Sequence, residues 1–150
     1  MGKTTNFYPI RVEDYPDINN CLAFALGITI ERPKSSKDYN LREDLPISEA
    51  FLNKCAEFGI EGVRQINSIE EATKEEYVIC VFYHWTTFRN PFYTDPIPYR
   101  EFHVIRRELN GNWVHKDWDS RPSIISKEEM IAIRREFPNP VAIFALKTED

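Results

Sequence analysis

The stretch "FHVIRRELNGNWVH", residues 102–115, decides the fold of this chain. In its first half, Phe102 and Val104 alternate with His103 and Ile105, and such an alternation with a period of two residues is typical of a β-strand. Asn110-Gly111 is a strong signal for a two-residue hairpin turn. The letters "NWVHKDW", residues 112–118, have the character of the returning strand. The stretch therefore predicts an antiparallel pair of strands with one histidine near the middle of each.

The register of this hairpin follows from the length of its turn. A two-residue turn at Asn110-Gly111 pairs positions whose numbers add to 221. His103 then faces Trp118, and His115 faces Arg106. The two imidazoles are expected on neighbouring strands but offset, so direct contact between them requires twist, a bulge or a longer loop.

Around the hairpin, the sequence predicts three helices and further strands. Residues 76–85 and 139–147 are rich in β-branched and aromatic residues, while residues 84–102 read as a long loop containing three prolines. The expected helices are residues 17–26, which begin near Asn19 or Asn20 and stop at Gly27, residues 47–58, capped by Ser48 and ended by Gly59, and residues 126–137, capped by Ser126. This order predicts the α+β class, in one domain spanning residues 1–150.

Composition narrows the classes of function. The net charge of −5 argues against a general nucleic-acid binder, and no apolar run reaches the length of a membrane span. The N-terminus lacks the apolar core of a secretory signal. The three cysteines match no metal-binding or disulfide pattern, so we expect reduced thiols, no metal and no cofactor. A metal site built from His103, His115 and Asp117 would leave the first cysteine unexplained.

Cys21 is the cysteine with the most promising surroundings. It lies in "DINNCLAFALG", residues 17–27, within the first turn of the expected helix. A helix N-terminus and a nearby histidine both favour the thiolate, and the free N–H groups there can also bind an oxyanion. A cysteine in such an apolar helix is also a common packing residue. Thiol chemistry therefore depends on a base supplied by another part of the chain.

His103 and His115 follow Cys21 in an order that resembles the papain-like thiol hydrolases of the NlpC type. That family has a cysteine at the start of a helix, a histidine on a central strand and a third polar residue, often histidine, about a dozen positions later. Twelve positions separate His103 from His115. The resemblance covers about residues 18–116, in order and spacing more than in identity. It implies a papain-like fold with the cysteine helix packed on a central antiparallel sheet.

The resemblance also implies roles for these side chains. Cys21 would attack an amide carbonyl, His103 would hold the proton, and His115 would fix the orientation and tautomer of His103. Asn19 and Asn20 would support the oxyanion or cap the helix.

The start "NNCLAFALG" departs from the family's usual Asp-Cys-Ser-Gly, with Asn20 in place of the acid and Leu22-Ala23 in place of Ser-Gly. This leaves the substrate class open. The related amidase branch would nominate Asp117 or Asp119 as the third member instead.

Three functions are consistent with these features. The first is a cysteine amidohydrolase or peptidase, with a peptidoglycan peptide as the expected substrate class. The second is a glutamine deamidase or acyltransferase that acts on a target protein with the same triad. The third is a binding protein that keeps the fold with an inert Cys21. We expect no nucleic-acid or membrane partner, and a location in the cytoplasm or outside the cell after export without a classical signal, as for a bacterial effector or phage protein.

Overall fold

The computed structural model describes residues 7–14, 21–27, 41–88, 92, 97–116, 121–139 and 141–148. Its centre is a six-stranded sheet of order β1-β6-β2-β3-β4-β5, in which every neighbouring pair is antiparallel. Helices together with this sheet agree with the expected α+β class. In chain order the elements are η1 (Val12–Asp14), α1 (Cys21–Leu26), α2 (Ile47–Glu57), β1 (Arg64–Ile66), η3 (Ile69–Glu71), β2 (Tyr77–Phe88), β3 (Ile97–Arg107), β4 (Trp113–His115), β5 (Ser123–Ile124), α3 (Lys127–Glu136) and β6 (Ala142–Leu146).

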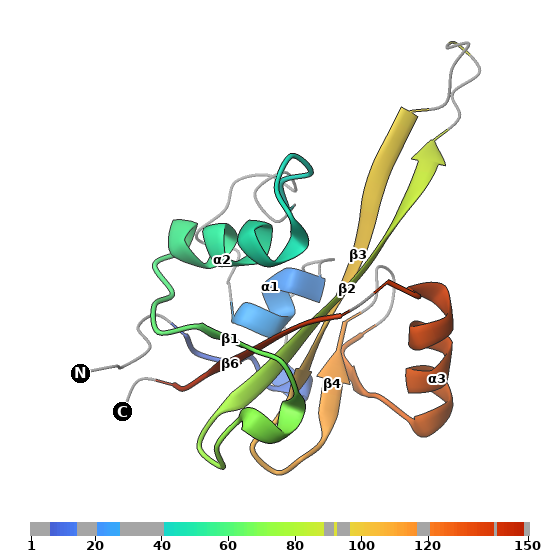
Figure 1. Ribbon diagram of the computed structural model, residues 1–150. Helices are drawn as coiled ribbons and strands as arrows, with labels where there is room; N and C mark the ends of the chain where they lie inside the picture. Colours follow the sequence, from blue (N-terminus) through green and yellow to red (C-terminus); the bar gives the residue numbers. More distant parts are fainter. Residues whose placement is uncertain are drawn as a thin grey trace.

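The helices cover both faces of the sheet, α1 and α2 on one side and α3 on the other (Figure 1). Because side chains alternate along a strand, each face has its own apolar core. Ile79, Val81 and Val104 pack with α1 and α2, whereas Phe82 and Ile105 pack with α3. The odd-numbered residues of β3 therefore belong to the face that α3 covers.

Strands β2 and β3 form a long hairpin that extends beyond the rest of the sheet (Figure 1). Its pairs run without a break from Val78↔Arg107 to Phe88↔Ile97. The expectation of a long loop over residues 84–102 is therefore wrong for most of that segment. Prolines excluded a helix there correctly, but Pro98 fits in β3 opposite Thr87, since proline is tolerated where a strand begins.

The turn between β3 and β4 is one residue longer than expected. Arg106 pairs with Val114 and Arg107 with Trp113, so paired positions add to 220 rather than 221. The N–H of Gly111 donates to the carbonyl of Glu108, and Gly111 has φ +95°, as in a three-residue loop closed by a left-handed glycine. A register change of one residue moves a side chain to the other face. The observed register places His115 opposite Ile105, and therefore on the same face of the sheet as His103.

The helix starts followed local rules in one case and not in the other. Ser126 caps α3 as expected, and its partner in a capping box is Glu129. Ser48 does not cap α2, because the N-cap of this helix is Pro46, two residues earlier, and Ser48 lies within the first turn. The Ser48 hydroxyl accepts a hydrogen bond from Gln65 instead. None of the described helices has the length and apolar character needed to cross a bilayer.

Buried Arg106 anchors α1 to the sheet. Its side chain is fully buried and donates hydrogen bonds to the carbonyls of Phe24, Ala25 and Ile10. Two of these carbonyls belong to the last turn of α1, where few N–H groups of the helix itself remain to bind them. Arg106 therefore fixes the position of the helix that begins with Cys21.

Candidate active site

The two hairpin histidines form a buried pair. His103 Nε2 lies 2.8 Å from His115 Nδ1, and the two rings meet edge to face with centroids 5.0 Å apart. His103 is 9% exposed and His115 3% exposed. A buried imidazole nitrogen needs a hydrogen-bond partner, and here each histidine supplies one to the other.

Phe137 holds this pair from the side of α3. Its ring is stacked on that of His103 with centroids 6.4 Å apart, and it also contacts the ring of His84 at 4.8 Å. His84 Nε2 is 3.5 Å from a carboxylate oxygen of Glu101. His84 and His103 thus lie beside the same aromatic ring, and His115 contacts His103 on that face of the sheet.

Glu129 of α3 faces the far nitrogen of His115. Its Oε2 is 3.7 Å from His115 Nε2, while its Oε1 accepts a hydrogen bond from the backbone N–H of Ser126 at 2.9 Å. The Ser126 backbone N–H is the main cause that lowers the pKa of Glu129, and His115 lowers it further. Glu129 is therefore an ionised partner for His115 at neutral pH.

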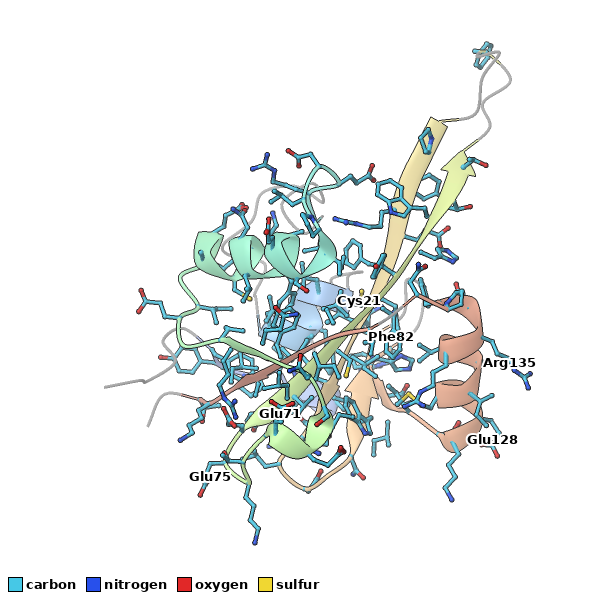
Figure 2. All side chains as sticks on the ribbon, viewed as in Figure 1. Cys21, Glu71, Glu75, Phe82, Glu128 and Arg135 are labelled. Carbon is cyan, nitrogen blue, oxygen red and sulfur yellow. The ribbon has the colours of Figure 1, made fainter. Side chains whose placement is uncertain are left out.

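Cys21 begins α1, next to the strands that carry the histidines. Helix α1 contacts both β3 and β4, and Cys21 packs against the core that lies under α1 and α2 (Figure 2). This is the opposite side of β3 from the face on which His103 and His115 meet. The structure thus brings the two histidines together and places Cys21 at the start of a helix on the same two strands.

The other two thiols are in different surroundings. Cys55 of α2 and Cys80 of β2 are buried, and burial raises the pKa of each to about 12. Desolvation disfavours the thiolate, so both are packing residues under ordinary conditions. Cys21 is partly exposed, which makes it the best placed of the three for chemistry.

Four other expected site residues lie outside the described residues. These are Asn19 and Asn20, expected to support an oxyanion, and Asp117 and Asp119, the alternative third members. Across the described ranges, no group of three or more histidine, cysteine or acidic side chains is arranged to hold a metal ion. The alternative metal site at His103, His115 and Asp117, which the sequence did not favour, has one member, Asp117, outside those ranges.

Two features of this site do not follow from the sequence pattern alone. The first is the contact of His103 with His115. The expected two-residue turn offset the two imidazoles, whereas a three-residue loop, which Gly111 also fits, brings them onto one face. The second is the position of Glu129 beside His115, which depends on how α3 packs against the sheet, although the Ser126–Glu129 spacing predicts a carboxylate fixed at the helix start. A cavity of about 670 Å³ also lies between the sheet and α3, with Phe82, Ile105 and Phe137 among its lining residues.

Comparison of the chain with protein-family models, with curated proteins and with solved structures found no match. Function is therefore argued from the geometry of the site.

Proposed function

We propose that this protein is a cysteine-dependent amide hydrolase of papain-like fold, with Cys21 as nucleophile, His103 as base and His115 as the group that orients His103. The observation that carries the proposal is the buried contact between His103 Nε2 and His115 Nδ1 at 2.8 Å. A nucleophile, a base and a third group that orients the base are the parts of such a site.

The contact matters because it uses one particular nitrogen of His103. When Nε2 donates to His115, the lone pair of the neutral ring lies on Nδ1. That nitrogen is then the base that takes the proton of Cys21. The Phe137 ring lies nearly parallel to that of His103, with centroids 6.4 Å apart, and covers the pair from the side of α3.

Cys21 has to reach His103 from the other side of β3. Strand β4 ends at His115, and the position opposite His103 in this register, residue 117, lies outside the described residues. Helix α1, which begins with Cys21, contacts both β3 and β4. We propose that the thiol approaches His103 along these two strands rather than through the sheet.

The reaction then has two steps. The sulfur of Cys21 attacks the amide carbonyl, and His103 Nδ1 takes the thiol proton and passes it to the leaving nitrogen as the C–N bond breaks. The product is a thioester and a free amine. In the second step His103 Nδ1 takes a proton from water, hydroxide attacks the thioester, and the carboxylic acid leaves as the proton returns to Cys21 sulfur.

The proposal is tested by incubating the protein with a panel of peptides that includes peptidoglycan stem peptides, followed by mass analysis of the products. We expect cleavage at an amide bond by the wild type and no cleavage by Cys21→Ala. Cys55→Ala is the matched control, because Cys55 is buried in α2 and takes no part in the reaction; it should retain cleavage.

Other results would contradict the hydrolase function in distinct ways. Conversion of glutamine side chains to glutamate in a target protein, without cleavage of its backbone, would identify a deamidase. Activity that survives in Cys21→Ala would exclude the thiol as nucleophile. A protein that binds a target equally well with and without Cys21, and changes none of these substrates, would be a binding protein.

A further inference from the structure

We propose that Glu129 is a positioning residue that fixes the tautomer of His115 and, through His115, that of His103. This inference rests on the proposed function and extends it by one group. Glu129 Oε2 is 3.7 Å from His115 Nε2, and His115 Nδ1 is 2.8 Å from His103 Nε2. The three side chains form a line from α3 through β4 to β3.

The capping box holds the Glu129 carboxylate in place. Oε1 accepts from the N–H of Ser126, and the N–H of Glu129 donates to the Ser126 hydroxyl at 3.1 Å. The Glu129 side chain is about half exposed, so these bonds, rather than burial, determine its direction. With Oε1 held by the helix start, Oε2 is the oxygen that faces His115.

A fixed negative charge selects one tautomer of the neighbouring ring. In neutral His115 the proton is favoured on Nε2, the nitrogen that faces the Glu129 carboxylate. The lone pair of the ring is then on Nδ1. That lone pair accepts from His103 Nε2–H and places the His103 lone pair on Nδ1, facing away from His115. Among the described residues, Glu129 from α3 and His103 from β3 are ionisable groups that face His115, and its partner on β5 is the uncharged Ser123.

Glu129→Gln tests this arrangement without removing the helix cap. Glutamine keeps an oxygen for the Ser126 N–H, and its amide N–H₂ then points at His115 Nε2. A donor at this place favours the opposite tautomer, with the proton on Nδ1. Glu128→Gln is the matched control, because it removes the same charge from the same helical turn and Glu128 lies on the outer side of α3 (Figure 2).

The measurement has two parts. The ¹⁵N shifts of the imidazoles, recorded at a pH where both rings are neutral, should show the His115 proton on Nε2 in the wild type and in Glu128→Gln, and on Nδ1 in Glu129→Gln. The alkylation rate of Cys21 by iodoacetamide should fall roughly tenfold or more in Glu129→Gln only. Ser126→Ala, which weakens the cap and keeps the carboxylate, separates a loss of helix stability from a change of tautomer.

The outcomes for Glu129 and for the thiol are distinguishable. Unchanged ¹⁵N shifts in Glu129→Gln would overturn the role of Glu129, whatever the reactivity of Cys21. A tautomer change with an unchanged alkylation rate would also overturn it, because the carboxylate would not act on the base. If Cys21 is equally slow in the wild type and in His103→Asn, the hydrolase function fails, and the ¹⁵N shifts still decide whether Glu129 fixes the His115 tautomer.

Discussion

At the scale of single residues, the site depends on which nitrogen of each imidazole is in use. His103 offers Nε2 to His115, and His115 offers Nδ1 to His103 and Nε2 to the carboxylate of Glu129. In the proposed mechanism, His103 Nδ1 is the nitrogen that takes the proton of the thiol. The sequence predicts Cys21, His103 and His115 as the site residues from their order and spacing. It does not predict which ring nitrogens pair, because that depends on the fold.

Burial separates the three thiols by reactivity. Because the pKa values of Cys55 and Cys80 are raised to about 12, their thiolate fraction near neutral pH is about a thousandfold below that of an ordinary thiol. We expect iodoacetamide to label Cys21 first in the native protein, and Cys55 and Cys80 only after unfolding in denaturant. Peptide mapping by mass spectrometry measures each rate. Native labelling of Cys80 as fast as Cys21 would contradict this order.

At the scale of elements, local rules predicted most of the helices and strands and missed the register between two of them. The capping box of α3 and the apolar patterns of β2 and β6 are local features, so the sequence revealed them. The β3–β4 register depends on whether Gly111 closes a two- or a three-residue loop, and both loops use glycine. That single residue decides whether His103 and His115 share a face. Strands β1 and β5 are too short to give a pattern and were missed.

The anchoring of α1 is an element-scale test of the structure. Arg106→Leu should lower the free energy of unfolding by about 3 kcal/mol, because three carbonyls and the Glu108 carboxylate lose a buried donor. Arg11→Leu is the control: the Arg11–Glu13 pair is largely exposed, so its loss should cost less than about 1 kcal/mol. Urea unfolding measures both. Equal midpoints for the two variants would contradict the anchoring role.

At the scale of the whole molecule, one sheet separates two apolar cores. The α1–α2 side carries Cys21 and the α3 side carries the histidine pair, so the site depends on both layers. The class of fold followed from the order of elements. The layer to which each histidine belongs could not be predicted in this way, because it depends on the long-range packing of α3 against the sheet.

The stability of the whole fold in acid depends on Glu76, which is nearly buried and paired with Arg64 of β1. The Arg64 guanidinium, with help from the Thr73 backbone N–H, lowers the pKa of Glu76 from 4.5 to about 2. A lowered folded-state pKa gives stability that is present above about pH 4.5 and lost as the pH falls through about 2.

Glu76→Gln should therefore destabilise the protein by about 2 kcal/mol at pH 7, and the difference from wild type should shrink below pH 4. Glu75→Gln, next to it in the chain, is the control and should show little effect at either pH. Urea unfolding at pH 7 and pH 3 gives the comparison. A Glu76→Gln penalty that is the same at both pH values would show that the Arg64 pair does not carry this stability.

The most direct test of the central claim is the rate of Cys21 alkylation against pH, in the wild type and in His103→Asn. If His103 takes the thiol proton, the wild-type rate stays high well below the pH at which an ordinary thiol ionises, near 8.5. In His103→Asn the rate should fall roughly tenfold or more at pH 6 and rise only as the free thiol ionises. Superimposable profiles, both following an ordinary thiol, would contradict a Cys21–His103 pair and with it the hydrolase function.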